Sequence, residues 1–496
     1  MTLHPSSFIN HLWISYIITH EHNEWCILRK LLMSSLLNIK DLPYEQQERI
    51  SRDLTIKIEQ TSFQKRKGMI TKPLIGYQLD GDILRLPYTY AGILQGRPAF
   101  NPVKPDINVQ YTGSLRDYQE SIVKEALEQL NTYSTTSLNL YTGAGKTVIA
   151  SYLGCRTRKT TLVLINATVL NSQWLETFTE HTNCKTWVVP EGKKIPDQCP
   201  DVIVCMSGRV NKIPEEWGQR IGTLIIDESH LFCTPGSIAP LLKYQPNYII
   251  SCSATPETRT GSHKLMQAIV GTHEVFRPIP FPFHITKLLT GVVPKLPSGV
   301  ATSDWSEVTK ALSHNQQRNM LIVNIILGQP HRKYLILTWC AEHVQLLQAY
   351  LTHYGIDNDV MVGSKKSYSD SHVLVGTIDK IGTGFDEKNA CDNFGGRRID
   401  TVILCGSTYS QGLLFQMVGR TFRSDDPHII DLVDSLPTLE RHWTEREKWY
   451  RKHKTKITSV EAPGYQKPKA VKRKTVRTVD EELQGELEFI DSIRYR

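Results

Sequence analysis

The sequence lacks a hydrophobic segment long enough to cross a membrane. Its most apolar N-terminal run, residues 8–19, is interrupted by His11 and is far shorter than the roughly 20 residues that span a bilayer. No basic residues precede this run and no small-residue cleavage site follows it, so we expect no signal peptide. These absences predict a soluble intracellular protein with no membrane partner, located in the cytoplasm or the nucleus.

The cysteines lack the close spacing that metal sites require. All ten are scattered along the chain, and none forms a CxxC pair. Such a pattern is typical of reduced thiols in an intracellular protein. We therefore expect neither a structural zinc site nor a disulfide framework.

The chain also lacks an even distribution of charge. It has 58 Lys and Arg residues against 50 Asp and Glu residues, for a net charge of +8. Between Arg446 and Arg477 there are 12 basic residues against 2 acidic ones, so this segment alone exceeds the net charge of the whole chain. A sequence-independent grip on polyanions is therefore predicted in the C-terminal tail.

The basic tail has three interpretations. Its densest cluster, Lys472, Arg473 and Lys474, is typical of a segment that binds nucleic-acid phosphates. The same cluster is typical of a nuclear-import patch. A solvated tail that folds back on the acidic segment 479–491 is the third interpretation.

Short apolar runs that alternate with helix-like segments predict an α/β fold. Runs such as 161–165 and 223–226 show no polar alternation, which is typical of strands buried on both faces of a parallel sheet. A proline-rich stretch interrupts the pattern, which restarts with runs such as 334–338 and 401–405. The sequence therefore predicts two parallel-sheet domains of similar size.

The predicted organisation has five parts. An N-terminal accessory domain includes a strand-like stretch at residues 82–90. The boundaries that we predict are 1–110 for the accessory domain, 111–277 for the first α/β domain, 278–300 for a proline-rich linker, 301–440 for the second α/β domain and 441–496 for a basic and then acidic C-terminal tail.

The clearest motif is a glycine-containing turn between a predicted strand and a predicted helix, at residues 138–147. The glycines let backbone N–H groups approach phosphate oxygens, and the N-terminus of the following helix adds partial positive charge. The lysine can reach the outer phosphates, and the threonine hydroxyl is a ligand for Mg²⁺. We therefore expect ATP to be bound by Thr142, Gly143, Ala144, Gly145, Lys146 and Thr147.

This motif departs from the usual phosphate-binding pattern at one position. The pattern GxxxxGK[ST] requires a glycine where this chain has Leu140. On the motif alone, a glycine turn that caps an ordinary strand–helix unit is therefore an alternative interpretation.

Two adjacent carboxylates follow a predicted buried strand in the same domain. Asp227 and Glu228 come directly after the apolar run 223–226. Asp227 is suited to hold the Mg²⁺ that bridges the terminal phosphates, and Glu228 to orient or deprotonate the attacking water. The pair supports the phosphate-binding interpretation of Lys146.

These motifs, together with others downstream, resemble superfamily 2 of the helicases and translocases. The first half of the pattern is Lys146, Asp-Glu-Ser-His at 227–230 and Ser-Ala-Thr-Pro at 253–256; the second half is Thr377, Gly-Thr-Gly-Phe-Asp at 382–386 and Gln-Met-Val-Gly-Arg-Thr-Phe-Arg at 416–423. The resemblance covers residues 112–440. It is strongest to the DExH-type helicases of large cytoplasmic DNA viruses, which include the poxvirus transcript-release helicase, followed by a phage relative that remodels branched DNA. It implies two tandem RecA-like domains.

The resemblance implies roles for residues of the first domain. Gln119 corresponds to the adenine-reading residue, although a simple helix start capped by Asp117 also explains this position. Ser253 and Thr255 correspond to the segment that links hydrolysis to strand movement. His230 would couple the nucleotide state to that segment.

The second domain is expected to complete the ATP site. By resemblance, the glycine turn that ends at Gly384 approaches either the ATP or a nucleic-acid phosphate, Asp386 is expected to touch the ribose, and Gln416 belongs to the catalytic motif. Arg420 and Arg423 are three residues apart, so we expect them on one face of a helix, pointing at the γ-phosphate as arginine fingers. Two solvated arginines on a surface helix are the alternative.

Contacts with the nucleic-acid strand are less well marked. By resemblance, Arg209, Thr377 and Lys380 are expected to contact the strand, although each position is equally compatible with no contact. The first strand-contact motif has Thr168 where the family usually has a basic residue, whereas the following Gln-Trp pair at 173–174 fits.

The expected function is therefore ATP-dependent movement on, or unwinding of, DNA, with ATP and Mg²⁺ as cofactors. The resemblance implies a role in viral transcript release or in recombination and repair, in the host cytoplasm or the virion, with transcription or replication machinery as partners. An RNA helicase is one alternative, because phosphate contacts do not distinguish DNA from RNA. An ATP-gated nucleic-acid-binding subunit without strand separation is another.

Overall fold

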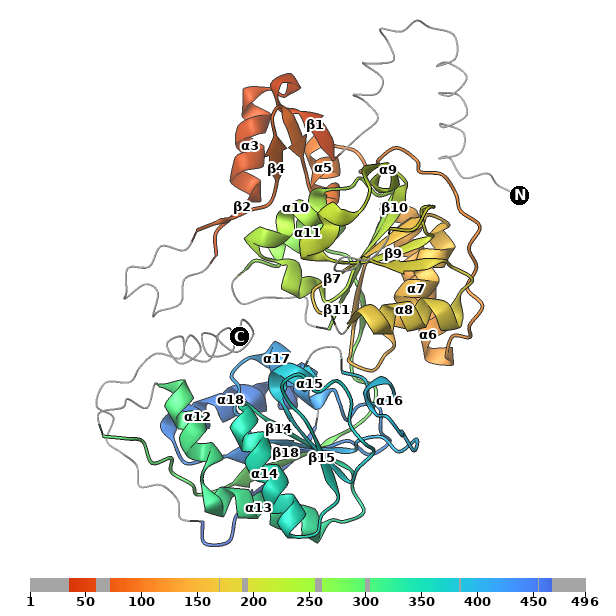
Figure 1. The fold of residues 1–496 in the computed structure, drawn as a ribbon. Coiled ribbons are helices and arrows are strands. Elements are labelled where there is room, and N and C mark those ends of the chain that lie inside the picture. Colours follow the sequence, from red (N-terminus) through yellow and green to blue (C-terminus); the bar gives the residue numbers. More distant parts are fainter. Residues whose placement is uncertain are drawn as a thin grey trace, which may run out of the picture.

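The computed structural model describes residues 35–58, 72–168, 170–189, 195–254, 261–298, 304–382, 385–453 and 455–465. They form a small N-terminal unit and two α/β domains, with the N-terminal unit beside the first domain and the second domain below it in Figure 1. Within these ranges no helix combines the length and the apolar character that a membrane span requires.

The N-terminal unit is a small antiparallel sheet covered by helices. Its elements are β1 (Leu36–Asn38), α3 (Tyr44–Leu54), β2 (Thr55–Ile56), β3 (Leu74–Ile75), β4 (Gln78–Asp80), β5 (Ile83–Arg85) and α5 (Tyr88–Gln95), with sheet order β1-β5-β4 and a separate β2-β3 ladder. The strand predicted at 82–90 is correct for 83–85 and wrong for 88–90, which begin α5. Pro87 precedes the helix, where its fixed φ and missing N–H are compatible with helix initiation.

The first α/β domain contains a seven-stranded sheet in the order β12-β6-β11-β10-β7-β9-β8, in which all the paired strands are parallel. Its strands are β6 (Thr135–Leu140), β7 (Thr160–Ile165), β8 (Thr186–Val188), β9 (Val202–Met206), β10 (Ile221–Ile226), β11 (Tyr248–Ser253) and β12 (Val275–Arg277), and its helices are α6 (Asp117–Tyr133), α7 (Lys146–Thr157), α8 (Leu170–His181), α9 (Glu215–Gly218), α10 (Ile238–Leu242) and α11 (Lys264–Val270).

Both faces of this sheet are buried, which explains its uninterrupted apolar strands. Alternate strand residues pack against α6, α7 and α8 on one face, as Val163 and Ile225 do. Their neighbours Leu162 and Leu224 pack against α10 and α11 on the other face, together with Leu74 from the N-terminal unit.

The second α/β domain repeats this architecture with the sheet order β15-β16-β14-β17-β18-β13-β19, again with parallel pairing. Its strands are β13 (His284–Leu289), β14 (Tyr334–Thr338), β15 (Asn358–Met361), β16 (Val373–Thr377), β17 (Thr401–Leu404), β18 (His428–Val433) and β19 (Lys456–Glu461), and its helices are α12 (Trp305–Ser313), α13 (Gln316–Gly328), α14 (Ala341–His353), α15 (Ile378–Gly382), α16 (Glu387–Ala390), α17 (Gln411–Val418) and α18 (Pro437–Lys452). The predicted fold class, two tandem RecA-like α/β domains, is confirmed.

The limits of the second domain differ from the predicted ones. Strand β13 lies within the range 278–300 that was predicted as a linker, yet it pairs with β18 on one side and β19 on the other. Most of α18, and all of β19, fall after residue 440 and were assigned to the tail. The prolines around β13 and the charged residues of α18 and β19 concealed these elements, because a buried element is predicted from an uninterrupted apolar run or stripe.

Helix α18 is held in the second domain by a buried ion pair. Arg446 is 2% exposed, and its Nε and Nη2 atoms donate to the two carboxylate oxygens of Asp431, each at 2.8 Å. The Tyr450 hydroxyl donates to the same carboxylate at 2.9 Å. The remaining donor Nη1 of Arg446 contacts Ser407 Oγ and the Thr408 carbonyl oxygen. Because most of these polar atoms are paired, the cost of burying the charges is offset.

We predict that Arg446→Ala destabilises the second domain by about 3–5 kcal/mol, because it leaves the Asp431 carboxylate buried and unpaired. Arg451→Ala is the matched control, since the Arg451 side chain on the same helix is 69% exposed in its pair with Glu447. The control should change the free energy of unfolding by less than about 1 kcal/mol. Urea unfolding of both variants measures the difference, and equal losses would contradict the prediction.

Two buried histidines, His343 and His442, and the partly buried His428 predict a pH dependence of stability in the second domain. Burial lowers the pKa of His343 to about 3, that of His442 to about 3 and that of His428 to about 4. Because these values lie below the ordinary value of 6.5, the unfolded chain binds the protons more tightly. The free energy of unfolding therefore falls as the pH falls below about 6.5, by up to about 1.4 kcal/mol per pH unit for each histidine.

The change that isolates this effect is His343→Gln, followed by chemical unfolding between pH 5 and pH 7. In the variant, the slope of unfolding free energy against pH should be smaller by the contribution of one histidine. This comparison of slopes does not depend on the absolute stability of the variant. A slope equal to that of the unchanged protein would show that His343 is not neutral in the folded state.

Candidate active site

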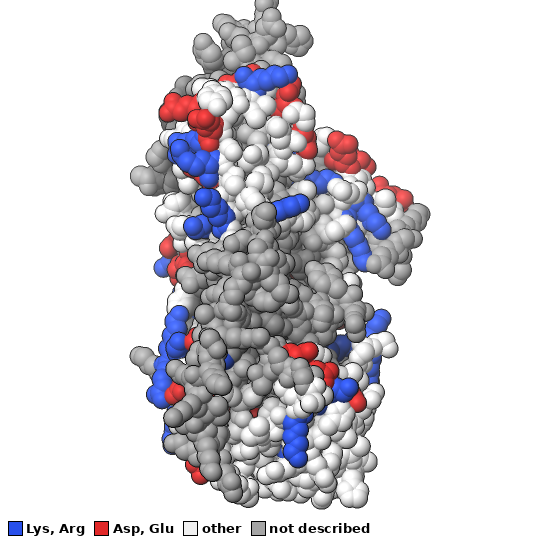
Figure 2. All heavy atoms as spheres, turned by 90° about the vertical axis from the view of Figure 1, so that its left-hand side faces the viewer, with Lys and Arg blue, Asp and Glu red and all other residues white. Residues whose placement is uncertain are grey.

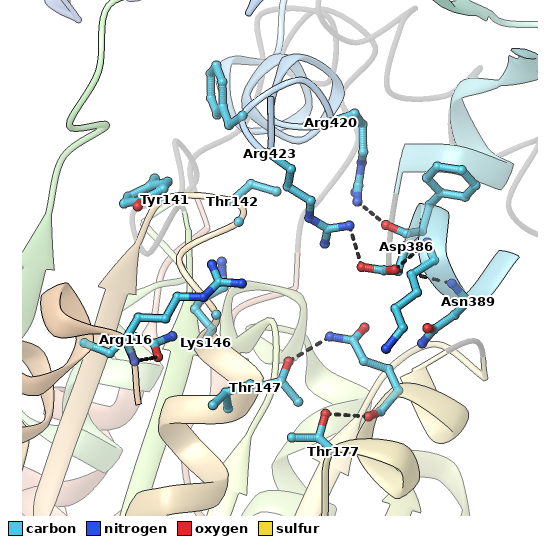
Figure 3. Close-up of a pocket in the computed structure, with 18 of the residues that line it drawn as sticks. Arg116, Tyr141, Thr142, Lys146, Thr147, Thr177, Asp386, Asn389, Arg420 and Arg423 are labelled. Carbon is cyan, nitrogen blue, oxygen red and sulfur yellow. Dashed lines mark hydrogen bonds and ion pairs between the residues drawn. The ribbon is translucent and has the colours of Figure 1, made fainter. Parts of the chain in front are cut away.

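A cavity of about 820 Å³ lies between the two α/β domains. Figure 3 shows Lys146 and Thr147 from the first domain facing Asp386, Arg420 and Arg423 from the second. The predicted ATP-site residues that line it are Gln119, Thr142, Gly143, Gly145, Lys146, Thr147, Asp227, Glu228, Asp386, Gln416, Arg420 and Arg423. Residues more than 250 positions apart in the sequence are thus brought to one cavity.

The phosphate-binding turn connects β6 to α7. Gly143 and Gly145 have φ angles of 96° and 81°, in the left-handed region that favours glycine, and α7 begins at Lys146. Lys146 Nζ donates to the Leu140 carbonyl oxygen at 3.2 Å. Leu140, the residue that departs from the motif pattern, is the last residue of β6 and is fully buried. It therefore belongs to the sheet and precedes the phosphate-binding turn.

Asp227 is buried at the carboxyl end of β10. Its Oδ2 atom accepts a hydrogen bond from Trp174 Nε1 at 2.7 Å, and its Oδ1 atom accepts one from the Glu228 backbone N–H at 3.0 Å. Burial and the neighbouring Glu228 carboxylate raise the pKa of Asp227, whereas Trp174 and Lys146 lower it. The carboxylate therefore needs these donors to remain ionised.

Thr147 is the second predicted Mg²⁺ ligand. Its hydroxyl oxygen accepts a hydrogen bond from Gln173 Nε2 at 2.8 Å. Residues 173 and 174 of α8 thus contact the two predicted ligands, Thr147 and Asp227 respectively. A hydroxyl oxygen and one carboxylate are hard donors of the kind that Mg²⁺ accepts when phosphates and water supply its other ligands, so the side chains fit the ion.

Glu228 has an unusual backbone conformation. Glu228 has φ 47° and ψ 52°, a left-handed conformation that costs a non-glycine residue about 1 kcal/mol or more. Its buried Oε2 atom has no hydrogen-bond donor among the described residues, and it lies 3.5 Å from His230 Nδ1. His230 Nδ1 also contacts Ser253 Oγ, the last residue of β11, at 3.0 Å. His230 therefore connects Glu228 to the end of β11.

Gln119 uses its side-chain amide to join α6 to the phosphate-binding turn. Its Oε1 atom accepts from the Arg116 backbone N–H at 3.0 Å, and its Nε2 atom donates to the Ala144 carbonyl oxygen at 3.1 Å. In the alternative interpretation the identity of the cap is wrong, because Arg116 is the N-cap of α6 and Asp117 is its first residue, whereas the helix start is present and Gln119 accepts from the backbone of the N-cap residue. Gln119 faces the cavity, and its reading of adenine stays a prediction.

Arg420 and Arg423 are not on a helix, contrary to the prediction. Helix α17 ends at Val418, and both arginines lie in the following turn, because their positions are fixed by contacts with other segments. Arg420 Nη1 donates to the Phe385 carbonyl oxygen at 2.7 Å, and Arg423 Nη1 donates to Asp386 Oδ2 at 2.5 Å. Burial and the adjacent Arg423 lower the pKa of Arg420 to about 10, so its guanidinium group remains charged at neutral pH.

The two domains touch across the cavity. A Cβ atom on Gly419 would lie 2.6 Å from Thr142 Cβ, and one on Gly143 would lie 3.5 Å from Arg423 Cγ. Asn389 Nδ2 of α16 donates to Glu176 Oε2 of α8 at 2.5 Å. The turn that carries the arginines therefore packs directly on the phosphate-binding turn.

The predicted strand contacts lie outside this cavity. Arg209 is in the short helix Ser207–Lys212 that follows β9, and Thr377 ends β16. Lys380 of α15 donates to the Gly363 carbonyl oxygen at 2.9 Å. Their roles stay predictions. Thr255, Gly384, Lys472, Arg473 and Lys474 lie outside the described residues.

The surface charge of the described residues is mixed on one face. Figure 2 shows basic side chains interspersed with acidic ones over both the upper and the lower part of this face. Within the described part of that view, no continuous basic band marks a path for a polyanion. The basic segment 446–477 is divided between α18 and β19 of the second domain and residues outside the described ranges.

Sequence reasoning missed two site residues and one interdomain contact. Gln173 and Trp174 were assigned to strand contact, but their side chains bond to Thr147 and Asp227. An indole N–H that is buried needs a hydrogen-bond acceptor. A tryptophan on the apolar face of a helix was therefore the available sequence signal, and Trp174 is fully buried in the structure. The Glu176 contact with Asn389 had no local signal, because it depends on the docking of the two domains.

Comparisons with known proteins agree with this geometry. Residues 112–258 match the family model described as "Type III restriction enzyme, res subunit". The chain is 29% identical over 379 residues to "Putative helicase 161L" of Invertebrate iridescent virus 6, covering 70% of this chain and 83% of that one. It is 32% identical over 346 residues to "Putative helicase 055L" of Frog virus 3 (isolate Goorha), covering 68% and 77%. It is 22% identical over 412 residues to "Putative ATP-dependent RNA helicase L396" of Acanthamoeba polyphaga mimivirus, covering 77% of each.

We predict that Trp174→Phe slows ATP hydrolysis by roughly 10- to 100-fold at neutral pH, the cost of a hydrogen bond to a charged group. Without the indole donor the pKa of Asp227 rises further, so the acid limb of the rate–pH profile should move to higher pH and activity should recover partly at alkaline pH. Trp187→Phe is the control, because Trp187 packs against Trp217 outside the cavity. A uniform loss with no shift of the acid limb would indicate a packing defect instead.

Proposed function

This chain belongs to superfamily 2 of the helicases, whose members are nucleic-acid-dependent ATPases, and from this membership we propose that it is an ATP-driven motor on DNA. The observation that carries the proposal is the cavity in which Lys146, Asp227 and Glu228 face Arg420 and Arg423. ATP bound there would contact both domains at once. Binding and release would then close and reopen the cleft, as movement along a strand requires.

The first domain would bind the nucleotide and position the attacking water. Lys146 and the backbone N–H groups after Gly143 would neutralise the phosphates, with Mg²⁺ held by Thr147 and Asp227. Glu228 would orient the water, since its carboxylate lines the cavity next to Asp227. Mg²⁺ would supply charge neutralisation at the terminal phosphates.

The second domain would stabilise the charge that develops on the γ-phosphate. Arg420 retains its positive charge despite burial, and Arg423 lies beside the phosphate-binding turn. The Gly419 contact with Thr142 would form only when the cleft is closed, so hydrolysis would depend on closure.

His230 would communicate the state of the nucleotide to the strand-binding segment. Its imidazole lies between Glu228 and Ser253, so a change at the γ-phosphate that moves Glu228 would alter the contact of His230 with the end of β11. This would couple hydrolysis to movement, the role predicted from the sequence.

The proposed substrate is DNA, with a role in viral transcript release or in recombination and repair. The match to a restriction-enzyme subunit over the ATP-binding domain supports DNA, and the relatives from Invertebrate iridescent virus 6 and Frog virus 3 support a viral role. RNA is the second candidate, supported by the name of the mimivirus relative. Phosphate contacts alone serve either polymer.

The test measures ATP hydrolysis by the purified protein alone and with duplex DNA, single-stranded DNA or RNA. We expect DNA to stimulate hydrolysis most, and Glu228→Gln to lower the stimulated rate by at least about 100-fold, the usual share of a positioned acid or base. Glu216→Gln, at an exposed position of α9, is the matched control and should leave the rate unchanged. Greater stimulation by RNA would overturn the DNA assignment.

A strand-displacement assay distinguishes unwinding from ATP-gated binding. DNA-stimulated hydrolysis with displacement of a labelled strand supports a helicase. Hydrolysis without displacement, but with clearing of a bound protein from DNA, supports a translocase. Absence of hydrolysis with every polymer would reject the motor.

A further inference from the structure

Two thiols of the first domain lie in contact, away from the cavity. Cys155 Sγ and Cys184 Sγ are 3.7 Å apart. Cys155 is 4% exposed on α7, two residues before the helix ends, and Cys184 is half-buried in the segment between α8 and β8. Residues 29 positions apart are therefore held side by side by the packing of α7 and α8, which are neighbours in Figure 1.

The surroundings of the pair make the two sulfurs chemically different. The contact between the two thiols lowers the pKa of Cys184, and the same contact, together with burial, raises the pKa of Cys155. Cys184 also lies next to Thr182, whose hydroxyl oxygen accepts from the Cys184 backbone N–H at 3.1 Å. Because Cys155 is buried and Cys184 is partly exposed, Cys184 is the thiol that peroxide reaches first, and the direction of its pKa shift agrees with this order. Cys184 is therefore suited to be the attacking cysteine and Cys155 the resolving one.

We propose that Cys155 and Cys184 are a peroxide-sensitive thiol pair that forms a reversible disulfide across α7 and α8. The Cys184 thiolate attacks one oxygen of hydrogen peroxide, so that an S–O bond forms, the O–O bond breaks and hydroxide leaves as water. The Cys155 sulfur, losing its proton, then attacks the Cys184 sulfenic acid, and the S–S bond forms as the S–O bond breaks and a second water leaves. Two thiols and one peroxide become one disulfide and two waters.

The geometry requires only a small movement. An S–S bond is about 2.05 Å long, so the sulfurs must approach by roughly 1.7 Å. A dithiol reduces the disulfide back to two thiols in the reverse exchange and is itself oxidised, which makes the bond a switch instead of a permanent crosslink. A reduced resting state agrees with the free cysteines of the structure and with the absence of paired cysteine motifs in the sequence.

The disulfide would act on the ATP site by tying the end of α7 to the segment that follows α8. Helix α7 carries Thr147 at its start, and α8 carries Gln173, whose Nε2 atom bonds to Thr147 Oγ1 at 2.8 Å. Pulling the end of α7 toward Cys184 shifts the two helices relative to each other, and with them this contact. We therefore expect slower ATP hydrolysis in the oxidised protein; this effect rests on the proposed function, whereas formation of the bond does not.

The experiment treats the full-length reduced protein with hydrogen peroxide, alkylates the remaining thiols and maps tryptic peptides without reduction. We expect a linked species that contains Cys155 and Cys184, lighter than the two peptides by two hydrogen atoms and released by dithiothreitol. The melting temperature of the oxidised protein should rise by roughly 5 °C or more, since the bond closes a loop in the unfolded chain. The rate of ATP hydrolysis should fall at least about fivefold, because a displaced Thr147 would position its ligands less well, and it should recover when dithiothreitol is added.

Serine variants separate the pair from other oxidation. Cys155→Ser and Cys184→Ser should each abolish the linked species and the peroxide response while retaining hydrolysis when reduced. Cys199→Ser, at another half-buried thiol, is the matched control and should behave as the unchanged protein. Loss of the Cys184 thiol without a linked peptide would overturn the disulfide, and an equal peroxide effect in the serine variants would overturn its effect on hydrolysis. If the reduced protein hydrolyses no ATP, the proposed function fails while the peptide map still decides the disulfide.

Discussion

The buried carboxylate of Asp227 is the constraint on which the first-domain half of the cavity depends. A charge at the end of an apolar strand is tolerated only when compensating groups surround it. Here Trp174 and the Glu228 backbone N–H donate hydrogen bonds to Asp227, and the positive charge of Lys146 lowers its pKa. To bring Trp174 to this point, α8 must pack against the same face of the sheet as α7. The position of Gln173 against Thr147 follows from that packing.

Closure of the cleft depends on small residues where the domains meet. Gly419 leaves room for Thr142, and the turn after α17 then carries Arg420 and Arg423 to the phosphate-binding turn. Helix α18, which is held by the Arg446 pair with Asp431, packs against α17, the helix that precedes the arginine turn. The same dependence on helix packing brings Cys155 to Cys184.

Some elements were predictable because local physics alone specifies them. Strands such as β7 and β10 are buried on both faces, so their apolar runs are continuous and unmistakable. Strand β13 and helix α18 were missed because their polar residues find partners only in the folded domain, as Arg446 does. The helix expected for Arg420 and Arg423 is wrong for the same reason. The segment after α17 follows its tertiary contacts with Phe385 and Asp386, which outweigh a local spacing rule.

The sequence by itself determined the chemistry that this protein carries: a glycine turn before Lys146, the pair Asp227 and Glu228 after an apolar strand, and the arginine motif in the second domain, all in the order of one helicase superfamily. The tertiary structure alone decided which groups support that chemistry, including the indole of Trp174 beneath Asp227 and the imidazole of His230 between Glu228 and Ser253. The physical reason is the distance along the chain between the residues that interact. Strand burial and phosphate-binding turns are encoded by neighbouring residues, whereas a hydrogen-bond partner is selected by the packing of segments distant in the chain.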